Sequence, residues 1–540
     1  MQKDISLKLK PSEASNEAIV KAYIARSSAV DTNQVTGYYI TRHSIDARSK
    51  QQVWINLSVK AFINEPFHQR QLQAVSFKDV HSARNKVIII GAGPAGLFAA
   101  LQLIEKGIQP IILERGKDVR ARRRDLAALN KEGIVNPDSN YCFGEGGAGT
   151  YSDGKLYTRS NKRGNITRIL NLFVQFGADE RILYETHPHI GTNKLPHIIT
   201  AMRQQIIDCG GLFLFEHRVT DFIVKDNELK GVIVHNGDSI YADSVILATG
   251  HSARDIFHLL HNKKIIIEAK PFALGVRIEH PQSLIDSIQY HCAIRDEHLP
   301  PSSYSLVEQV NRRGVFSFCM CPGGIIAPAA TAPEELVVNG WSPSKRNNPF
   351  ANSGMVVSIE LKDAMQFMQH EIKNNKAEIP NTTLLERDAP LALMLFQQSV
   401  ERRAFAAGGG KFRAPAQRVA DFCTHKTSAT LPDCSYLPGV IAADMNKVLP
   451  SFVHTCLQEG IKAFGKKMKG YYTNDAVVVA TESRTSSPVR IPRNPDTLEH
   501  IQIKNLYPCG EGAGYAGGII SAAMDGEKVA AMIVQKLAGA

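Results

Sequence analysis

The stretch KVIIIGAGPAGLFAALQLIEKGIQPIILERG, residues 86–116, decides the fold. Four consecutive apolar residues, Val87 to Ile90, precede glycines spaced as GxGxxG, and an apolar helix-like segment and a second apolar run follow. This order is typical of a βαβ unit that binds a dinucleotide. The 18 residues from Val87 to Ile104 carry no charge, which approaches the length of a membrane span. Pro94 and three glycines inside this run favour a strand, a turn and a helix instead.

Each glycine of this turn has a separate physical role. Gly91 allows the tight turn, Gly93 lets the backbone approach a pyrophosphate, and Gly96 allows the helix to pack closely on the strand. The phosphates would then lie at the positive N-terminus of the helix. Glu114 ends the second strand, where a carboxylate accepts hydrogen bonds from a ribose and repels a 2′-phosphate, although Arg115 beside it could favour one. We expect NAD or the ADP half of FAD here, rather than NADP.

A second glycine-rich segment, CGEGAGYAGGI at 509–519, lies more than 400 residues further on and precedes the final helix. A single NAD would not need this second anchor, whereas the longer FAD would. Glu511 could bind ribityl hydroxyls there. The N-terminus of the following helix could face the flavin pyrimidine edge and stabilise the negative charge of the reduced ring. The two segments together favour FAD.

At this point the chain resembles the two-dinucleotide-binding-domain, glutathione-reductase-like flavoproteins, and within them the bacterial FAD-dependent dehydrogenases of unassigned substrate. The resemblance implies FAD binding and redox chemistry without naming a substrate. The segments that carry it span nearly the whole chain: GAGPAG at 91–96, FGEGGAGTYSDGKLYT at 143–158, ILATGHSARD at 246–255, FALGVRIEHPQ at 272–282, CMCPGGIIAPA at 319–329, GGGKFRAPAQRV at 408–419, ESRTSSPVRIPR at 482–493 and CGEGAGYAGGI at 509–519.

Motifs and resemblance together give a set of expected FAD contacts, ordered from the ADP half to the flavin end. They are Gly91, Gly93, Pro94, Ala95, Gly96, Glu114, Arg115, Val219, Thr249, Gly250, Gly147, Thr150, Ser152, Gly510, Glu511, Gly517, Gly518 and Ile519. Val219 is expected to meet the adenine through its backbone, and Thr249 and Gly250 mark a return strand beneath the cofactor.

Three cations are candidates for catalysis. Lys155, in the glycine-rich loop 143–158, could stabilise a reduced anionic flavin or a substrate carboxylate, or it could be a solvated surface lysine. Arg254 follows a buried strand and could clamp an anionic substrate, or it could form a structural ion pair with Asp255. Arg484 could likewise clamp an anionic substrate or form a structural ion pair.

The cysteines and histidines suggest neither a metal site nor a disulfide framework. The nine cysteines form no CxxC pair, and the eighteen histidines form no HxxxH or HExxH motif. Cys319 and Cys321 would project from one face of a strand, at or beyond the distance that a disulfide usually spans. We expect small packing residues there, one of which could be a reactive thiol.

The charge balance favours anionic partners, because 63 basic residues exceed 52 acidic ones and give a net charge of +11. The basic run RGKDVRARRR, 115–124, raises the possibility of nucleic acid. No aromatic residue interrupts it to stack on bases, so a solvated face is the preferred interpretation. The N-terminus has no apolar segment typical of a signal peptide, and we expect a cytoplasmic protein without a membrane span.

The expected fold is α/β: a Rossmann-type FAD-binding domain with an inserted α+β substrate domain and a small N-terminal βαββ domain. The boundaries are 1–80 for the N-terminal domain, 81–270 completed by 491–540 for the FAD domain, and 271–490 for the substrate domain. The sequence of the N-terminal domain does not indicate a function for it.

The expected function is that of an FAD-dependent oxidoreductase, a dehydrogenase or reductase that transfers hydride through non-covalently bound FAD to or from an unidentified small substrate, which could be an anion. With no second complete GxGxxG unit, any NAD(P)H would have to dock transiently. Two alternatives remain open: a flavoprotein that acts on RNA, and a non-catalytic flavin-binding redox sensor. No stable nucleic-acid partner is expected, and the sequence leaves the oligomeric state open.

Overall fold

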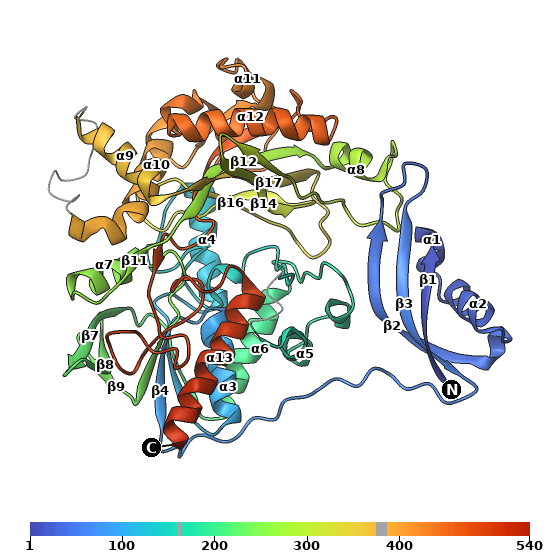
Figure 1. Cartoon of the computed structure of the whole chain (residues 1–540), viewed down its shortest axis with the longest axis horizontal. Helices are drawn as coiled ribbons and strands as arrows, with labels where there is room; N and C mark the ends of the chain where they lie inside the picture. The colour runs from blue at the N-terminus through green and yellow to red at the C-terminus, as the bar shows by residue number, and fades with distance from the viewer. Residues whose placement is uncertain (159–163, 374–385, 540) are drawn as a thin grey trace.

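A five-stranded parallel sheet forms the core of the lower left lobe in Figure 1, which draws the computed structural model; the structure describes residues 1–158, 164–373 and 386–539. The strand order is β22-β10-β4-β5-β6. Both faces of such a sheet are normally covered, which explains why its strands are almost continuously apolar. The bounds are β4 (Lys86–Ile90), β5 (Gln109–Leu113), β6 (Leu212–Leu214), β10 (Ser244–Leu247) and β22 (Leu506–Pro508).

Alternate residues of β4 pack into different cores, as the pleat of a strand requires. Val87 and Ile89 belong to the core formed with the helices α3, α5, α6 and α13, whereas Ile88 and Ile90 belong to the core formed with the small sheet β7-β8-β9. The bounds are α3 (Pro94–Glu105), α5 (Ile166–Gln175), α6 (Leu195–Asp208), α13 (Ile519–Ala538), β7 (Val219–Lys225), β8 (Glu228–Val234) and β9 (Ser239–Tyr241).

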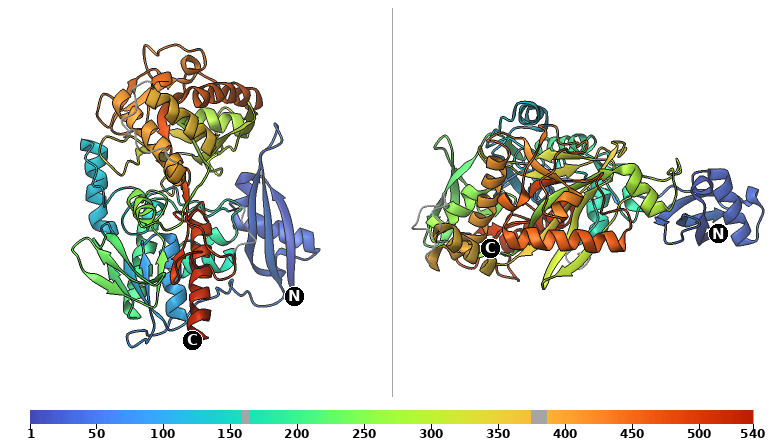
Figure 2. Two further views of the ribbon diagram at one scale, coloured as in Figure 1. Left: turned by 60° about the vertical axis from the view of Figure 1, so that its left-hand side comes forward. Right: turned by 90° about the horizontal axis from the view of Figure 1, so that it is seen from above.

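Helices α3 and α13 lie side by side, although they are far apart in sequence (Figures 1 and 2). Gly526 of α13 makes the close approach possible, because a Cβ there would lie 2.1 Å from the carbonyl oxygen of Ala95. The N-termini of α3 and α13 are therefore held near each other.

A seven-stranded sheet forms the upper lobe in Figure 1, in the order β13-β14-β17-β12-β20-β18-β19. All neighbouring pairs are antiparallel except β18 and β19. Helices α10 (Ala392–Ala407) and α12 (Ser451–Lys467) share its core. The strand bounds are β12 (Phe272–Pro281), β13 (Val307–Val310), β14 (Arg313–Cys321), β17 (Phe350–Ile359), β18 (Ala414–Arg418), β19 (Val440–Ala442) and β20 (Val477–Glu482).

The N-terminal residues form a separate lobe, which the two views of Figure 2 show beside the rest of the chain. Its antiparallel sheet has the order β1-β3-β2, with α1 (Pro11–Ala14) and α2 (Glu17–Ser28) after the first strand. The bounds are β1 (Gln2–Leu9), β2 (Val35–Asp46) and β3 (Trp54–Ile63). The backbone N–H of His43 donates to the carbonyl of Tyr184 at 2.8 Å, which ties this lobe to the main body.

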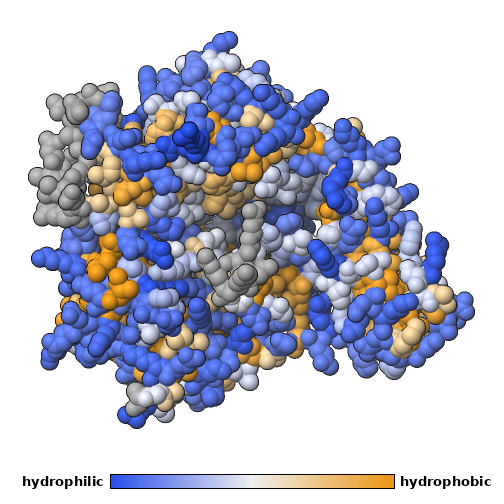
Figure 3. Space-filling view, in the orientation of Figure 1, coloured by the Kyte–Doolittle hydropathy of each residue, from blue (hydrophilic) through white to orange (hydrophobic). Residues whose placement is uncertain are grey.

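The expected fold class is confirmed. The uncharged run 87–104 is divided into strand, turn and helix, as its glycines and proline predict. Within the described residues, no helix is both long and apolar enough to cross a membrane. The face of the molecule in Figure 3 is mostly hydrophilic, which agrees with apolar side chains gathered in the cores.

Candidate functional site

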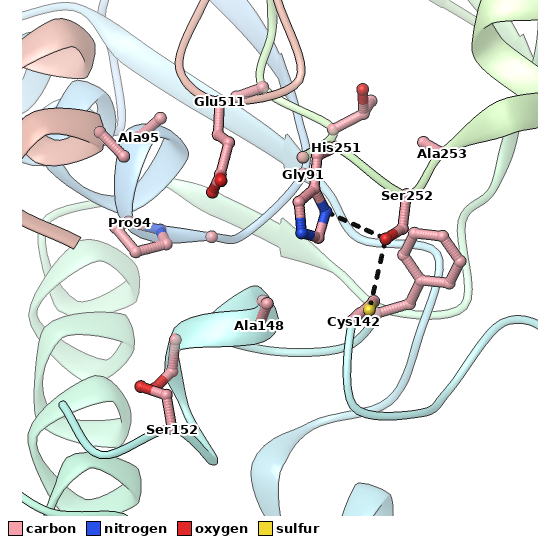
Figure 4. Close-up of a pocket in the computed structure, with 18 of the residues that line it drawn as sticks. Gly91, Pro94, Ala95, Cys142, Ala148, Ser152, His251, Ser252, Ala253 and Glu511 are labelled. Carbon is pink, nitrogen blue, oxygen red and sulfur yellow. Dashed lines mark hydrogen bonds between the residues drawn. The ribbon is translucent and has the colours of Figure 1, made fainter. Parts of the chain in front are cut away.

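A cavity of about 340 Å³ lies where the parallel sheet, the N-termini of α3 and α13, and the seven-stranded sheet meet. The turn after β4, the loop 142–157 and the segment after β10 contribute to its wall, as do residues of β14 and the loop before α13. Chain segments separated by more than 400 residues therefore share one site. Figure 4 shows part of this wall, with Glu511 on one side and Ala148 and Ser152 on another.

The turn after β4 depends on its glycines. Gly91 has a φ of 105°, a left-handed conformation that favours glycine, and a Cβ there would lie 2.5 Å from the carbonyl oxygen of Ala248. A Cβ on Gly96 would lie 2.0 Å from the carbonyl oxygen of Gly91. At Gly93, the N-cap of α3, the nearest described atom to a Cβ is 4.0 Å away. The backbone at Gly93 is thus open toward the cavity.

The carboxylate of Glu114 organises the backbone around it. Its oxygens accept hydrogen bonds from the backbone N–H groups of Ala92, Gly116 and Gly144, each at 2.9 Å. A carboxylate offers about four acceptor positions, so roughly one remains for a ligand hydroxyl. Glu114 also lines the cavity. It can therefore hold the turn and accept a ribose hydroxyl at the same time.

The loop before α13 exposes backbone to the same cavity. At Gly517 and Gly518 no described atom lies within 4 Å of a Cβ position, and both residues line the wall with Ile519. Gly518 is the N-cap of α13. Glu511 lines the wall close to Pro94 and Ala95 in Figure 4. Two helix N-termini with open glycine backbone form a cradle that fits an elongated diphosphate ligand such as FAD.

Most of the predicted contacts line the cavity. Gly96, Thr150 and Gly510 do not, and neither does the catalytic candidate Arg254. Gly96 packs beneath the turn and Gly510 packs against Ala95, where a Cβ would come within 2.9 Å of the Ala95 side chain. The Thr150 hydroxyl is buried and donates to the carbonyl of Glu145 at 2.7 Å. These residues are placed to support the wall rather than to contact a ligand.

Arg254 and Arg484 belong to one buried charge cluster. Arg254 donates to Glu335 at 2.9 Å and to Glu401 at 2.8 Å, and Arg484 donates to the same carboxylates at 3.2 and 3.0 Å. Burial would raise the pKa of Glu401, but the two guanidinium groups lower it to about 2. The predicted anion clamp at Arg254 is thus already occupied by protein carboxylates. Arg484 still contributes to the cavity wall.

The wall beside β14, called here the β14 wall, consists of Asp153, Lys155, Tyr157, Phe318, Cys319 and Asn339. The expected regular strand through the two cysteines is interrupted: the pairing of β14 with β17 shifts register between Phe318 and Cys321, and Cys319 has a φ of 45°. Both cysteines line the cavity, but the bulge leaves Cys319 exposed, whereas Cys321 is buried. Desolvation by the protein groups around Cys319 raises the pKa of its thiol, although the side chain is open to the cavity, so the thiol form is favoured over the thiolate at neutral pH.

Sequence reasoning missed Arg122, which belongs to the basic run expected to be a solvated face. Arg122 is completely buried and donates to the carbonyls of Asn140, Tyr141, Glu145 and Gly147 at 2.7 to 3.0 Å. It therefore fixes the loop that enters the cavity wall. A sequence signal exists: Val119, Arg122, Leu126 and Leu129 are the buried residues of α4 (Val119–Glu132) and follow helical spacing.

Within the described residues, no group of three or more potential ligands could hold a metal ion. The open glycine backbone at two helix N-termini, with an acceptor carboxylate beside each, places this site in the class of dinucleotide-binding flavoproteins. Four family descriptions match: an FAD binding domain over 84–126, an FAD-dependent protein, C-terminal domain-like, over 271–485, glucose inhibited division protein A over 197–286, and a domain of unknown function over 1–62.

A protein of Clostridium beijerinckii described as uncharacterized is 37% identical over 535 residues, which cover 96% of each chain. The chain therefore belongs to a family of FAD-dependent flavoproteins of unassigned substrate, as its motifs indicate. The tRNA uridine 5-carboxymethylaminomethyl modification enzyme MnmG of Alkaliphilus metalliredigens is 30% identical over 167 residues, 30% of this chain and 24% of that one. A geranylgeranyl bacteriochlorophyll reductase-like protein of Thermoplasma acidophilum has 11% identity and a TM-score of 0.34, over 84% of this chain and 79% of that one.

Proposed function

We propose that this protein is a dehydrogenase or reductase that transfers hydride through non-covalently bound FAD to or from a small anionic substrate. The observation that carries the proposal is one cavity that joins the N-termini of α3 and α13 to the β14 wall. FAD supplies the two-electron chemistry when it is bound. The neighbouring β14 wall leaves a place for the molecule that exchanges hydride with it.

Different residues of the chain would bind different parts of the cofactor. Gly93 and the N-terminus of α3 would hold the pyrophosphate, and Glu114 would accept a ribose hydroxyl. Glu511 would accept a ribityl hydroxyl, and the N-terminus of α13 would stabilise negative charge on the ring system. Lys155 would supply a second positive charge from the β14 wall.

No specific observation favours the alternative of an RNA-acting flavoprotein. The basic run is not a continuous cationic surface, because Arg122 is buried, Arg115 pairs with Asp138 and Asp255, and Lys117 pairs with Asp125. The likeness to the tRNA-modifying enzyme covers 24% of that enzyme.

The test is an anaerobic visible spectrum of the purified protein before and after NADH, NADPH and a panel of organic acids are added separately. Rapid bleaching of the flavin band by NADH or NADPH would identify a reductase fed by transient nicotinamide docking. Bleaching by an organic acid alone would identify a dehydrogenase. Flavin that only dithionite reduces would contradict the proposal and favour the redox-sensor alternative.

A further inference from the structure

We propose that the β14 wall binds the carboxylate of a small aromatic or conjugated acid, with the carboxylate between Lys155 and Asn339. This inference rests on the proposed function, because it names the substrate class for the same site. It follows from the hydrogen-bonding groups that the wall leaves available. It also follows from the aromatic side chains beside them.

The acidic side chains of this region are already paired. Asp153 is 4% exposed and accepts from the guanidinium of Arg346 at 2.8 Å. Burial opposes ionisation of Asp153, but Lys155 and Arg346 lower its pKa below the usual value. Behind the wall, Glu482 pairs with Arg277 at 2.8 Å. Neither carboxylate is available to hold a cationic or donor-rich substrate.

The remaining polar groups of the wall are mainly donors. The ammonium of Lys155 has three N–H groups, donates one to the carbonyl of Met320, and lies 3.9 Å from Asp153. The amide oxygen of Asn339 accepts from its neighbour Gly340 at 2.7 Å and from Arg277 at 3.3 Å. These bonds fix the amide so that its NH₂ group is left to donate. An acceptor-rich anion is the ligand that satisfies both groups.

Both donors line the cavity and are connected to the bulge in β14. Lys155 is bonded to the carbonyl of Met320, and Arg277, which holds Asn339, donates to the carbonyl of Cys319 at 2.7 Å. Lys155 is thus bonded directly to one peptide group of the bulge, and Asn339 is linked to the preceding peptide group only through Arg277. Bulges that redirect side chains in this way are common beside active sites.

Aromatic side chains flank the donors. Phe318 is half-buried in the wall, and Tyr157 is 52% exposed. The ring of His187 meets Tyr157 edge-on, with centroids 5.0 Å apart, which orients the tyrosine ring. A flat apolar ligand can pack on such surfaces while its carboxylate reaches the donors. Protonated primary amines are disfavoured because the two positive charges of Lys155 and Arg346 exceed the single negative charge of Asp153.

The test is calorimetric titration of the FAD-loaded protein with four probes: benzoate, benzamide, cyclohexanecarboxylate and benzylamine. Benzoate should bind at least tenfold more tightly than each of the others. FAD content and reduction by dithionite are measured first on the same preparation. A protein without FAD would contradict the proposed function, whereas a reducible FAD-loaded protein that binds benzamide, cyclohexanecarboxylate or benzylamine as tightly as benzoate would overturn this inference alone.

Two variants locate the subsite. Lys155→Met and Asn339→Asp should each weaken benzoate binding at least tenfold and change benzamide binding much less, because both changes act on the carboxylate. Lys447→Met, at an exposed lysine outside the cavity wall, is the matched control. A benzoate-to-benzamide ratio that is the same in both cavity variants and the control would overturn the inference. Melting temperatures of all three confirm that they are folded.

Discussion

Glu114 shows how one side chain can serve fold and ligand together. Its carboxylate holds three backbone N–H groups from three different segments, and it faces the cavity. The position of Glu114 at the end of the second strand is visible in the sequence. Its bond to Gly116 is local, two residues along the chain, whereas its bond to Gly144 is not visible in the sequence because it depends on where the loop 140–147 folds back.

Replacement of Glu114 with Gln should weaken FAD binding and the fold around the turn. The amide nitrogen would face backbone donors, and each buried N–H that loses its acceptor costs about 1–3 kcal/mol. We expect at least a tenfold faster release of FAD, measured by flavin fluorescence after dilution. The control is Glu499→Gln, whose carboxylate pairs with Lys536 away from the cavity. FAD release at the wild-type rate in Glu114→Gln would contradict this role.

Helices α3 and α13 form the central pair of elements, and Gly526 sets their distance. A Cβ at Gly526 would lie 2.1 Å from the carbonyl oxygen of Ala95, so Gly526→Ala forces the helix backbones apart. Overpacking of this kind costs roughly 1–3 kcal/mol. We expect a lower urea midpoint and partial loss of FAD. Gly539→Ala, where a Cβ would be 3.6 Å from its nearest neighbour, should leave both unchanged.

Strand β12 and helix α12 bury histidines that make stability depend on pH. Burial lowers the pKa of His280 to about 4, and burial followed by the charge of His425 lowers the pKa of His454 to about 4. An unfolded histidine titrates near 6.5. The unfolded chain therefore binds more protons between pH 6.5 and 4, so the stabilisation is complete above pH 6.5 and is lost as the pH falls toward 4.

The corresponding measurement is urea unfolding at pH 7.5 and at pH 5.5, where most carboxylates are still ionised. Each of these histidines should contribute a slope of up to about 1.4 kcal/mol per pH unit below pH 6.5. His280→Gln should have a shallower dependence than the wild type. Equal stability of the wild type at both pH values would contradict the buried, neutral state of these side chains.

For individual helices and strands, local sequence patterns predicted much of the structure. The apolar runs and glycine spacing of 86–116 contain the strands, turn and helix that the structure shows, because those features are local. The bulge at Cys319 was not predicted, and the structural ion pairs considered for Arg254 and Arg484 form with Glu335 and Glu401 rather than with Asp255. They depend on Arg277, Glu335 and Glu401, which approach only after distant strands and helices pack together.

For the whole molecule, we propose that residues 1–80 form a domain separable from the flavin-binding part. Residues 64–85 connect the N-terminal lobe to β4 and contain no helix or strand. Limited trypsin digestion should cut first after Lys78 or Arg84, both of which are exposed. The large fragment should keep its FAD. Loss of FAD together with that cut would show that the N-terminal lobe completes the site.

The central claim is that one FAD is held non-covalently across the N-termini of α3 and α13. The most direct measurement is acid precipitation of the purified protein, followed by chromatographic identification and quantification of the flavin in the supernatant. The account predicts release of FAD at close to one molecule per chain. FMN in its place, flavin retained on the precipitated polypeptide, or a chain that binds no FAD after incubation with the cofactor would contradict it.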